Sequence, residues 1–556
     1  VGTTEVLRNQ LYDVMHLGID LPTDLVILDE AHFLGDEERG VVWEEIMIYL
    51  PARINLLLLS ATIGNVKQIA NWLESIRAKK CVVVEETKRP VPLFPLFFHP
   101  TGRLLPLMDS RNVDKKVQRY LKSKSSAKIL PSFDKMLRVL EQYNLLPVIF
   151  FLKGRNDCNN ALEVCLNRSC PDELKRSKID EILSELTVQY PSLRTHTHLM
   201  YLKNAAVAAH HSGQLPAWKL AVEELMTEGL LDAVFATSTV AAGVNFPARS
   251  VVFLNSDRFN GHEFVPLNAT QFHQMTGRAG RRGMDRIGFA IITPGRFMNV
   301  NLMATLYSSQ PENIISQIRV DFSMVLNLLL SHSPEEIKEI FQRSFATYLL
   351  KQAHKKPQSD KQLWDKFLQY LDFLKEENFV REDNTLTEEG KWASQLRIDQ
   401  PLMIAEGLRK GVFTEFDPVL LAAQVAPFVY DREVDDEFDE SLVPKRLIKA
   451  YHKMVQSLLP LIKRKKKKGF EVRQIPFWPA ATVYSWASGE QWETILEVSG
   501  LTEGDCAMLI SRTADNLRQI ASLTTVYPQI AKVSSEAIAR ILREPIIESN
   551  VPGSID

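Results

Sequence analysis

Short, continuous apolar runs, each ending in small or polar residues, constrain the fold of this chain more than any other feature. Two runs lie near the start, at 25–28 and 54–62, with a segment of helical spacing between them at 39–50. Five more follow at 145–152, 206–213, 231–239, 250–256 and 288–294. Apolar strands that alternate with helices are typical of parallel sheets covered on both faces. The pattern predicts two α/β sheets, of which the first is incomplete.

The second half of the chain has a different character, with long amphipathic segments of helical spacing. Residues 323–330 and 334–345 are helical in pattern, and 370–393 reads as helix, strand, turn, strand, helix, which is typical of a winged helix. The fold class is therefore α/β plus α. The predicted divisions are a partial α/β domain at 1–98, a connector at 99–135, a second α/β domain at 136–300, a winged-helix region at 301–397 and a helical bundle domain at 398–556.

Composition limits the classes of protein that the chain can represent. Its 556 residues suffice for three or four domains, and 66 basic against 68 acidic residues give a net charge of -2. This balance argues against a uniformly basic surface, so binding to nucleic acid would need a local channel. Five cysteines without a C-x-x-C pair predict reduced thiols in an intracellular, cytoplasmic protein. No apolar run approaches the ~18 residues of a membrane span, so no membrane partner is expected.

Three further features favour ordinary structural interpretations. The acidic stretch at 431–440 and the basic run at 463–468 are expected to be solvated loops, although the basic run could instead contact phosphates. His196 and His198 have the spacing of metal ligands on a strand. Neither a cysteine nor a carboxylate partner is evident in the sequence, so surface histidines are expected instead of a metal site.

The sequence DEAH at 29–32 follows the first apolar run and precedes a loop. Asp29 can hold Mg²⁺, partly through water, and Glu30 can polarise an attacking water as a base. The alternative is a helix N-cap with solvated acidic side chains. Ser60 and Thr62 end the next apolar run, which makes them candidates for coupling a nucleotide site to a substrate.

Two later motifs suit phosphate chemistry. In ATSTVAAGVNFPAR (236–249), the hydroxyls of Thr237 and Thr239 and the backbone near Gly243 could line a phosphate-binding turn, unless this is a plain strand–helix junction. In QMTGRAGRRG (274–283), Arg278 and Arg281 each follow a glycine and fit a helix or tight turn that presents both guanidinium groups. Arginine bonds phosphate bidentately, so both are candidate arginine fingers. A Gly/Arg-rich RNA-binding tract is the alternative.

Together these motifs resemble the DExH branch of superfamily 2 helicases, and most closely the superkiller-type, exosome-associated RNA helicases. The resemblance preserves motif order along nearly the whole chain. The matching segments are TTEVLRNQLYD (3–13, motif Ib), DEAH (motif II), SAT (60–62, motif III), PVIFFLKGRNDC (147–158, motif IV), 236–249 (motif V) and QMTGRAGRRGMD (274–285, motif VI). Residues 210–219 are similar to a strand-gripping segment, 257–269 to a strand-separating β-hairpin, 321–345 to the first winged-helix segment and 482–520 to the C-terminal helical DSHCT domain.

The resemblance implies two RecA-like domains, the first truncated, followed by the winged helix and the helical domain. It implies ATP and Mg²⁺ as cofactors. The nucleotide and metal residues it implies are Asp29, Glu30, His32, Gly243, Asn245, Arg278 and Arg281, with Gln274 as a further catalytic residue. The implied nucleic-acid contacts are Thr3, Thr4, Arg8, His211, Ser212, Gly213, Thr237, Thr239, Arg512 and Arg518. For Arg512 and Arg518, ordinary exposed helix arginines are an equally good interpretation.

Three departures from the family pattern qualify the prediction. Motifs Q, I and Ia are missing and no G-x-x-x-x-G-K-[ST] occurs, so the chain is expected to be a fragment that starts in mid-domain and has little ATPase activity by itself. Residues 346–366 leave no room for the family's arch and are expected to form only a linker. Met508 stands where related sequences often carry arginine, which weakens one expected strand contact.

The resulting hypothesis is a monomeric, ATP-dependent 3′-to-5′ helicase on single-stranded or partly duplex RNA. Ribonucleases and ribosome-associated proteins are the candidate partners. Two alternatives stay open: a DNA-repair helicase of the same superfamily, and a nucleic-acid-binding pseudo-helicase without ATPase activity. The physiological RNA and the protein partners do not follow from the sequence.

Overall fold

The computed structural model describes residues 1–546 except 111, 124–129, 167–172, 239–245, 261–262, 354–357, 399, 414–415 and 430–442. Its contacts divide the chain into two compact units. Unit 1 comprises residues 1–59, 67–82 and 314–556, and unit 2 comprises residues 60–66 and 83–313. Among the residues described, no helix has the length and apolar character to cross a bilayer.

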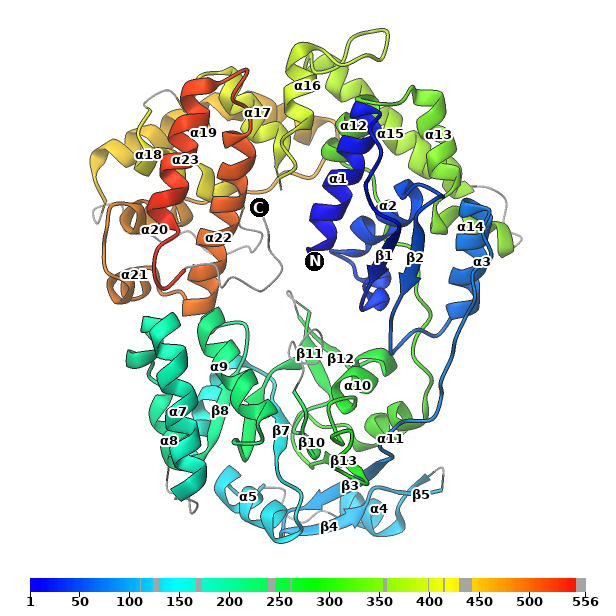
Figure 1. Cartoon of the computed structure of the whole chain (residues 1–556), viewed down its shortest axis with the longest axis vertical. Helices are drawn as coiled ribbons and strands as arrows, with labels where there is room; N and C mark the ends of the chain where they lie inside the picture. Colours follow the sequence, from blue (N-terminus) through cyan, green and yellow to red (C-terminus); the bar gives the residue numbers. More distant parts are fainter. Residues whose placement is uncertain are drawn as a thin grey trace. The chain divides into compact units, whose positions relative to one another are not determined.

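Unit 1 contains the first sheet, which has two strands (Figure 1). Strand β1 (Leu25–Leu28) pairs in parallel with β2 (Asn55–Leu58), as the apolar runs predict. One face of the pair is covered, with Val26 and Leu28 buried, whereas Leu25, Ile27, Leu57 and Leu59 on alternating positions are 43 to 54% exposed. The helices beside this sheet are α1 (Thr4–Leu17), the 3₁₀ helix η1 (Ala31–Gly35), α2 (Gly40–Tyr49) and α3 (Val66–Arg77).

The middle of unit 1 is helical. Its elements are α12 (Phe322–Leu329), α13 (Pro334–Gln342), α14 (Phe345–Gln352), α15 (Gln358–Glu376) and α16 (Glu388–Ser394). The two short strands expected between 370 and 393 are reduced to a single antiparallel bridge between Val380 and Leu386. The stretch 346–366, expected to be only a linker, instead contains most of α14 and the start of α15. The apolar residues at 348–350 and 363–364 belong to these two helices, and the linker interpretation overlooked them.

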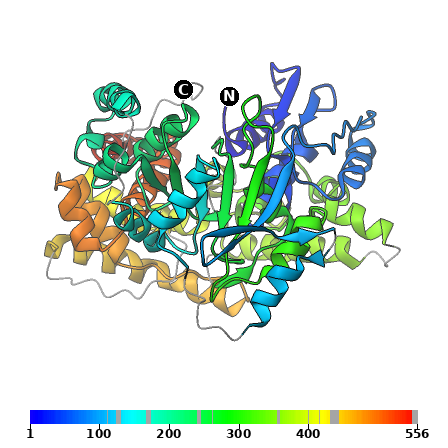
Figure 2. The ribbon, with the colours of Figure 1, turned by 90° about the horizontal axis from the view of Figure 1, so that it is seen from below.

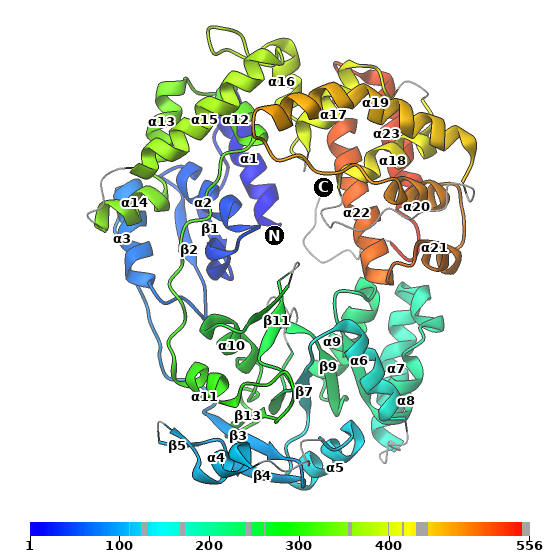
Figure 3. The ribbon, with the colours of Figure 1, turned by 180° about the vertical axis from the view of Figure 1, so that it is seen from behind.

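The C-terminal part of unit 1 is a group of packed helices (Figure 3). They are α17 (Pro401–Arg409), α18 (Pro418–Val425), η4 (Ala426–Phe428), α19 (Lys445–Lys467), α20 (Trp478–Ala487), α21 (Trp492–Ser499), α22 (Glu503–Ala521) and α23 (Pro528–Ile541). Trp486 of α20 is fully buried and donates its indole N–H to the Ile541 carbonyl at 2.7 Å. This bond and the packing of α18 against α20 and α23 give the helices one core.

Unit 2 contains a seven-stranded sheet in the order β4-β3-β13-β10-β7-β9-β8. All neighbouring pairs are parallel except β3 with β4, and β3, in blue in Figure 2, runs beside the green strand β13. The strands are β3 (Leu93–His99), β4 (Arg103–Pro106), β7 (Val148–Phe151), β8 (Val207–His210), β9 (Ala233–Ala236), β10 (Ser250–Phe253) and β13 (Gly288–Ile292). The five strands predicted between 145 and 294 are thereby confirmed.

The helices and small ribbons of unit 2 surround this sheet. The helices are α4 (Lys115–Lys122), α5 (Phe133–Gln142), α6 (Arg155–Val164), α7 (Glu173–Gln189), η2 (Pro191–Thr195), α8 (Leu199–Ala205), α9 (Pro216–Thr227), α10 (Ala269–Thr276) and α11 (Val300–Ser308). Two short ribbons accompany them. In one, β5 (Met108–Asp109) pairs with β6 (Asn112–Val113), and in the other, β11 (Asp257–Phe259) pairs with β12 (Phe264–Pro266). Phe150, Phe235 and Leu137 lie in the core between sheet and helices.

One predicted boundary is wrong. Residues 93–98 were expected in the first domain and 99–135 in a connector, but β3 and β4 form the edge of the second sheet. The reason is that β3 pairs with a strand far along the chain: Leu93–Phe97 pair in parallel with Gly288–Ile292, almost 200 residues later. Phe97 and Phe98 are fully buried by this pairing, which adjacent sequence does not reveal.

Candidate nucleotide and nucleic-acid site

The DEAH sequence forms a tight turn at the carboxyl end of β1, in unit 1. Glu30 adopts a left-handed backbone conformation with φ 57°, which is uncommon for a residue with a Cβ. Asp29 stabilises the turn, because its Oδ1 accepts the Glu30 N–H at 2.8 Å. The Ala31 N–H donates to the carbonyl of Leu59, the residue after β2, at 2.8 Å. Asp29 is exposed and Glu30 half-buried, so the turn holds two adjacent, accessible carboxylates at a strand end.

His32 lies behind these carboxylates. Its Nδ1 is 3.2 Å from Oε2 of Glu30, and its ring stacks on Phe33 with centroids 4.6 Å apart. Burial lowers the pKa of His32, which outweighs the opposing effect of the charges on Glu30, Asp36 and Asp29. A neutral imidazole beside Glu30 fixes the position of that carboxylate without neutralising its charge.

Helix α2, which follows the DEAH turn, buries two consecutive glutamates that the sequence analysis missed. Glu44 accepts the Phe345 N–H at 2.7 Å and the Ser316 hydroxyl at 2.6 Å. Glu45 accepts the Tyr12 hydroxyl at 2.7 Å. Burial raises the pKa of each carboxyl to about 7. Their position in the otherwise apolar pattern of 39–50 is the signal that could have identified them.

Glu45 and Arg397 both hold helix α1, the segment matched to motif Ib. The Arg8 guanidinium lies 3.7 Å from Glu45 and also donates to the Asn9 side chain at 3.1 Å. Arg397 contacts Asp13 at 2.6 Å and donates to the Asn9 carbonyl at 3.0 Å. The Thr3 hydroxyl caps α1 by accepting the Val6 N–H, and Thr4 donates to Glu5 at 3.2 Å. These bonds position α1, and the nucleic-acid contacts of Thr3, Thr4 and Arg8 stay predictions.

Unit 2 brings the predicted coupling and catalytic residues together. The Gln274 side chain of α10 donates a long hydrogen bond of 3.5 Å to the buried Thr62 hydroxyl, and Ser60 accepts the Thr62 N–H at 3.4 Å. Gly64 lies close to the backbone of residues 311–312, since its N–H bonds the Glu312 carbonyl and an added Cβ would lie 2.4 Å from the Pro311 carbonyl. Motif III therefore contacts the helix that carries motif VI.

The QMTGRAGRRG segment begins as helix α10 and continues as a tight turn after Thr276. Gly280 has φ 85°, and its N–H bonds the Ala248 carbonyl, while the Arg278 carbonyl accepts the Ala248 N–H. The predicted tight turn is confirmed. Arg281, however, donates two side-chain bonds to Asp285, at 2.8 and 3.0 Å, in addition to its backbone N–H.

Asp285 is a buried carboxylate that the sequence analysis did not single out. Its side chain is 1% exposed and also lies 3.8 Å from Arg249. Burial alone would raise the pKa of Asp285, but the hydrogen bonds from Arg281 and the charges of Arg281 and Arg249 outweigh it, so the pKa lies below its ordinary value. Arg281 thus has a structural partner besides its predicted role as an arginine finger.

We expect Arg281→Ala to destabilise unit 2 by roughly 3 kcal/mol, because it removes the principal partner of a buried carboxylate. Urea unfolding at pH 7 measures the effect as a lower midpoint. Since the folded-state pKa of Asp285 is depressed, this stabilisation is present above the ordinary pKa of 3.8 and is lost as the pH falls through the folded value. The difference between wild type and variant should therefore shrink below about pH 4.

Arg282→Ala is the matched control, since Arg282 is the exposed neighbour of Arg281. Its unfolding midpoint should equal that of the wild type. Equal midpoints for the two variants would mean that the bonds between Arg281 and Asp285 contribute no stability.

The segment after β8 forms a compact turn. The His211 N–H donates to the Gln214 side chain at 3.1 Å, and His211 Nδ1 accepts the Gly213 N–H at 3.2 Å. His211 and Gly213 are buried, and Ser212 is exposed at the tip. The turn therefore presents Ser212, and its strand-gripping role stays a prediction.

The structure places only part of motif V. Thr237 follows β9 at the same edge of the sheet, whereas Thr239, Gly243 and Asn245 lie outside the described residues. On helix α22, Arg512 is half-buried and Arg518 donates to Asp515 at 2.5 Å. Met508 is 41% exposed one turn before Arg512.

The prediction that His196 and His198 are surface residues on a strand is wrong. His196 and His198 follow the 3₁₀ helix η2 and are not on a strand. His196 is buried, not on the surface. Its ring stacks on that of Trp218 with centroids 3.7 Å apart, and this contact shields it from water. The acidic stretch at 431–440 lies outside the described residues.

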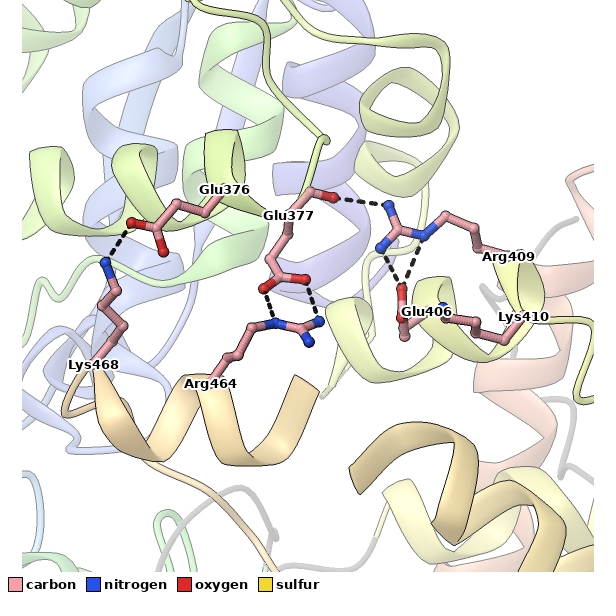
Figure 4. Close-up of polar contacts among 7 residues, drawn as sticks. All are labelled: Glu376, Glu377, Glu406, Arg409, Lys410, Arg464 and Lys468. Atoms are coloured by element: carbon pink, nitrogen blue, oxygen red, sulfur yellow. Dashed lines mark hydrogen bonds and ion pairs between the residues drawn. The ribbon is translucent and has the colours of Figure 1, made fainter. Parts of the chain in front are cut away.

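The basic run at 463–468 is not a solvated loop: residues 463–467 are the end of helix α19, and Lys468 is its C-cap (Figure 4). Lysines and arginine suit this position because the helix dipole is negative at its C-terminus. Arg464 donates to both carboxylate oxygens of Glu377 at the end of α15, and Lys468 pairs with Glu376. The hydrogen bonds to Glu377 raise the pKa of Arg464. Arg409 of α17 donates to the Glu377 carbonyl at 2.8 Å and pairs with Glu406, beside a polar cavity of about 520 Å³.

We expect Glu377→Ala to lower the stability of unit 1 by about 3 kcal/mol, because Glu377 is 4% exposed and joins α15 to α19. Thermal unfolding measures the change. Glu376→Ala is the matched control: its ion pair with Lys468 is 49 and 44% exposed, so its loss should cost about 0–1 kcal/mol. Similar melting temperatures for the two variants would contradict the structural role of Glu377.

Three family models match the chain. They are the DEAD/DEAH box helicase at residues 1–69, the helicase conserved C-terminal domain at 172–283 and the DSHCT (NUC185) domain at 383–549. With the parallel-sheet α/β cores and the helical C-terminal region, these matches define the class as a DEAD/DEAH-box helicase with a DSHCT domain.

The chain is homologous to superkiller-type helicases of superfamily 2. It is 32% identical over 421 residues to the DExH-box ATP-dependent RNA helicase DExH15, chloroplastic, of Arabidopsis thaliana, covering 63% of this chain and 36% of the relative. It is 31% identical over 437 residues to the Superkiller complex protein 2 of Homo sapiens (72% and 34%) and 33% identical over 354 residues to the Exosome RNA helicase MTR4 of Homo sapiens (59% and 34%). The chain thus spans 34 to 42% of the length of such curated relatives.

Proposed function

We propose that this protein is an ATP-dependent RNA helicase that moves 3′ to 5′ along single-stranded or partly duplex RNA. The observation that carries the proposal is the ordered set of helicase motifs, with motif III bonded to motif VI through Thr62 and Gln274. A contact of this kind can transmit the state of the nucleotide to elements that hold a substrate strand. The Arabidopsis relative and MTR4 are both named as RNA helicases, which supports RNA as the substrate.

Asp29 and Glu30 fit an ATP site with a divalent metal. Adjacent, accessible carboxylates at a strand end are the oxygen donors that Mg²⁺ prefers, and a bound Mg²⁺ would neutralise phosphate charge. Asp29 would hold the metal. Glu30, fixed by its turn and by His32, would orient and deprotonate the attacking water. Gln274, Arg278 and Arg281 would supply hydrogen bonds and positive charge to the phosphates.

Exposed and half-buried polar side chains of the segments described above would hold the strand. In unit 2 these are Ser212 at the tip of its turn and Thr237 after β9. In unit 1 they are the start of α1 and the face of α22 that carries Arg512 and Arg518. The β11–β12 ribbon carries two exposed rings, Phe259 and Phe264, at 48 and 45%. Exposed aromatic rings can stack on bases, so this ribbon would separate the strands of a duplex.

We also infer a winged-helix arrangement for α12, α13 and α15, with the bridge between Val380 and Leu386 as a minimal wing. The proposed domains are an α/β domain at 136–300 to which β3 and β4 also belong, a winged-helix region at 301–397 and a helical domain at 398–556. A cytoplasmic, monomeric protein with ribonuclease or ribosome-associated partners completes the proposal. The free thiols of Cys158 and Cys506, both buried, fit a reducing compartment.

Strand displacement tests the function, with the protein expressed from its complete reading frame. Matched RNA and DNA duplexes with 3′ or 5′ overhangs are incubated with ATP and Mg²⁺. We expect displacement of the RNA duplex that has a 3′ overhang, and ATP hydrolysis that is stimulated by single-stranded RNA. Unwinding of DNA alone would favour the DNA-repair alternative, and RNA binding without ATP hydrolysis would establish a pseudo-helicase.

A further inference from the structure

The side chain of Lys153 lies between two aromatic rings at the carboxyl edge of the sheet in unit 2. Its Nζ is 3.9 Å from the centroid of Phe264 and 3.7 Å from that of Phe297. The same atom lies 3.4 Å from Oδ2 of Asp257. The lysine and aspartate side chains are 23 and 21% exposed, so this contact is largely shielded from water. A shielded ammonium between two ring faces is attracted to both.

Sheet topology explains why these residues meet. Strands β13, β10 and β7 are neighbours and parallel, so their carboxyl ends share one edge. Lys153 follows β7, the β11–β12 ribbon follows β10, and Phe297 follows β13. Lys153 therefore joins the ends of three adjacent strands through a single side chain.

The β11–β12 ribbon needs such support. It pairs only three residues on each strand, and an isolated two-stranded ribbon is marginally stable in water. Its base is fixed by Ser256, whose N–H donates to the Phe297 carbonyl at 3.0 Å and whose carbonyl accepts the Leu267 N–H at 2.9 Å. Farther along the ribbon, Phe264 contacts Phe259 with centroids 5.3 Å apart and receives Lys153 on its ring.

We propose that Lys153 is a positioning residue for strand separation: its contacts with Phe264, Phe297 and Asp257 hold the β11–β12 ribbon at the angle at which its exposed rings meet the duplex. The proposal rests on the helicase function proposed above. Lys153 neither touches the substrate nor takes part in hydrolysis. It determines how many base pairs are separated for each ATP hydrolysed.

The test measures base pairs separated per ATP hydrolysed by the full-length protein on an RNA duplex with a 3′ overhang. Lys153→Met keeps the length of the side chain and removes its charge, and we expect a ratio about three- to tenfold lower than that of the wild type. ATP hydrolysis stimulated by single-stranded RNA should stay unchanged. Lys153→Arg, which keeps a cation over both rings, should restore most of the ratio.

The matched control is Lys203→Met, since Lys203 forms an ion pair with Asp180 at 2.8 Å elsewhere in unit 2. Its ratio should equal that of the wild type. Phe297→Leu should lower the ratio as Lys153→Met does, and the double variant should lose little more, because the two residues share one contact.

The outcomes separate this inference from the proposed function. If the wild type displaces RNA and Lys153→Met separates as many base pairs per ATP, the inference is wrong while the function stands, even if Lys153→Met lowers the unfolding midpoint. If the wild type displaces no RNA duplex, the proposed function fails first, and the positioning role fails with it.

Discussion

Replacing Arg278 with alanine is expected to lower the rate of ATP hydrolysis by about a thousandfold or more. The guanidinium group supplies positive charge where negative charge builds up on the phosphates, and arginines in this role contribute on the order of 10³ to 10⁵ in rate. Arg278 occupies a turn whose backbone bonds to Ala248 do not involve the side chain that the substitution removes. The fold should therefore survive the substitution.

The measurement is steady-state ATP hydrolysis by the full-length protein with saturating single-stranded RNA. Arg282→Ala serves as the control, because Arg282 is an exposed arginine in the same turn. Comparison with Arg281→Ala adds information, because that variant should lose stability as well as hydrolysis through the loss of its bonds to Asp285. A variant lacking Arg278 that hydrolyses ATP within tenfold of the wild type would remove this residue from the catalytic set.

Glu30→Gln is expected to lower hydrolysis by about 10²- to 10⁴-fold while nucleotide binding persists, because the amide keeps the shape of the side chain but cannot accept a proton. The backbone supports this role. A left-handed conformation at a residue with a Cβ costs about 1–2 kcal/mol, and such strain is found where a side chain must be aimed at a site. Binding of a fluorescent ATP analogue, measured beside turnover, separates the two effects.

Glu37→Gln provides the matched control for this variant. Glu37 is an exposed carboxylate in the same loop, seven residues after Glu30. Its removal should leave both binding and turnover unchanged. Retention of wild-type turnover by Glu30→Gln would assign the base to another residue, and loss of nucleotide binding would indicate that Glu30 acts chiefly through the metal.

The sequence predicted the strands well, because parallel strands buried on both faces must be apolar throughout. It also placed DEAH and SAT at the ends of strands, where ligand contacts occur, and QMTGRAGRRG in a helix or tight turn. It failed where pairing connects distant segments. Strand β3 was assigned to the first domain because it follows that domain in the chain, yet its partner is β13.

The residues that support the site were harder to predict than the residues within it. Asp285, Glu45 and Lys153 are single charged side chains whose importance depends on what folding brings beside them. Asp285 differs from other aspartates in this sequence because Arg281 and Arg249 enclose it. Lys153 became distinctive only once β7, β10 and β13 were neighbours. Contacts between such distant segments leave no periodic pattern in the sequence.

The open face of the β1–β2 pair has a practical consequence. Leu25, Ile27, Leu57 and Leu59 present a row of half-exposed aliphatic side chains on one face of a two-stranded parallel ribbon. Monomeric proteins rarely leave such a row uncovered, since neighbouring copies can associate through it. The colloidal behaviour of residues 1–556, including their solubility on a column and their tendency to associate as concentration rises, should therefore be governed by these four leucine and isoleucine side chains, while the balanced charge of the rest of the surface contributes little repulsion between copies.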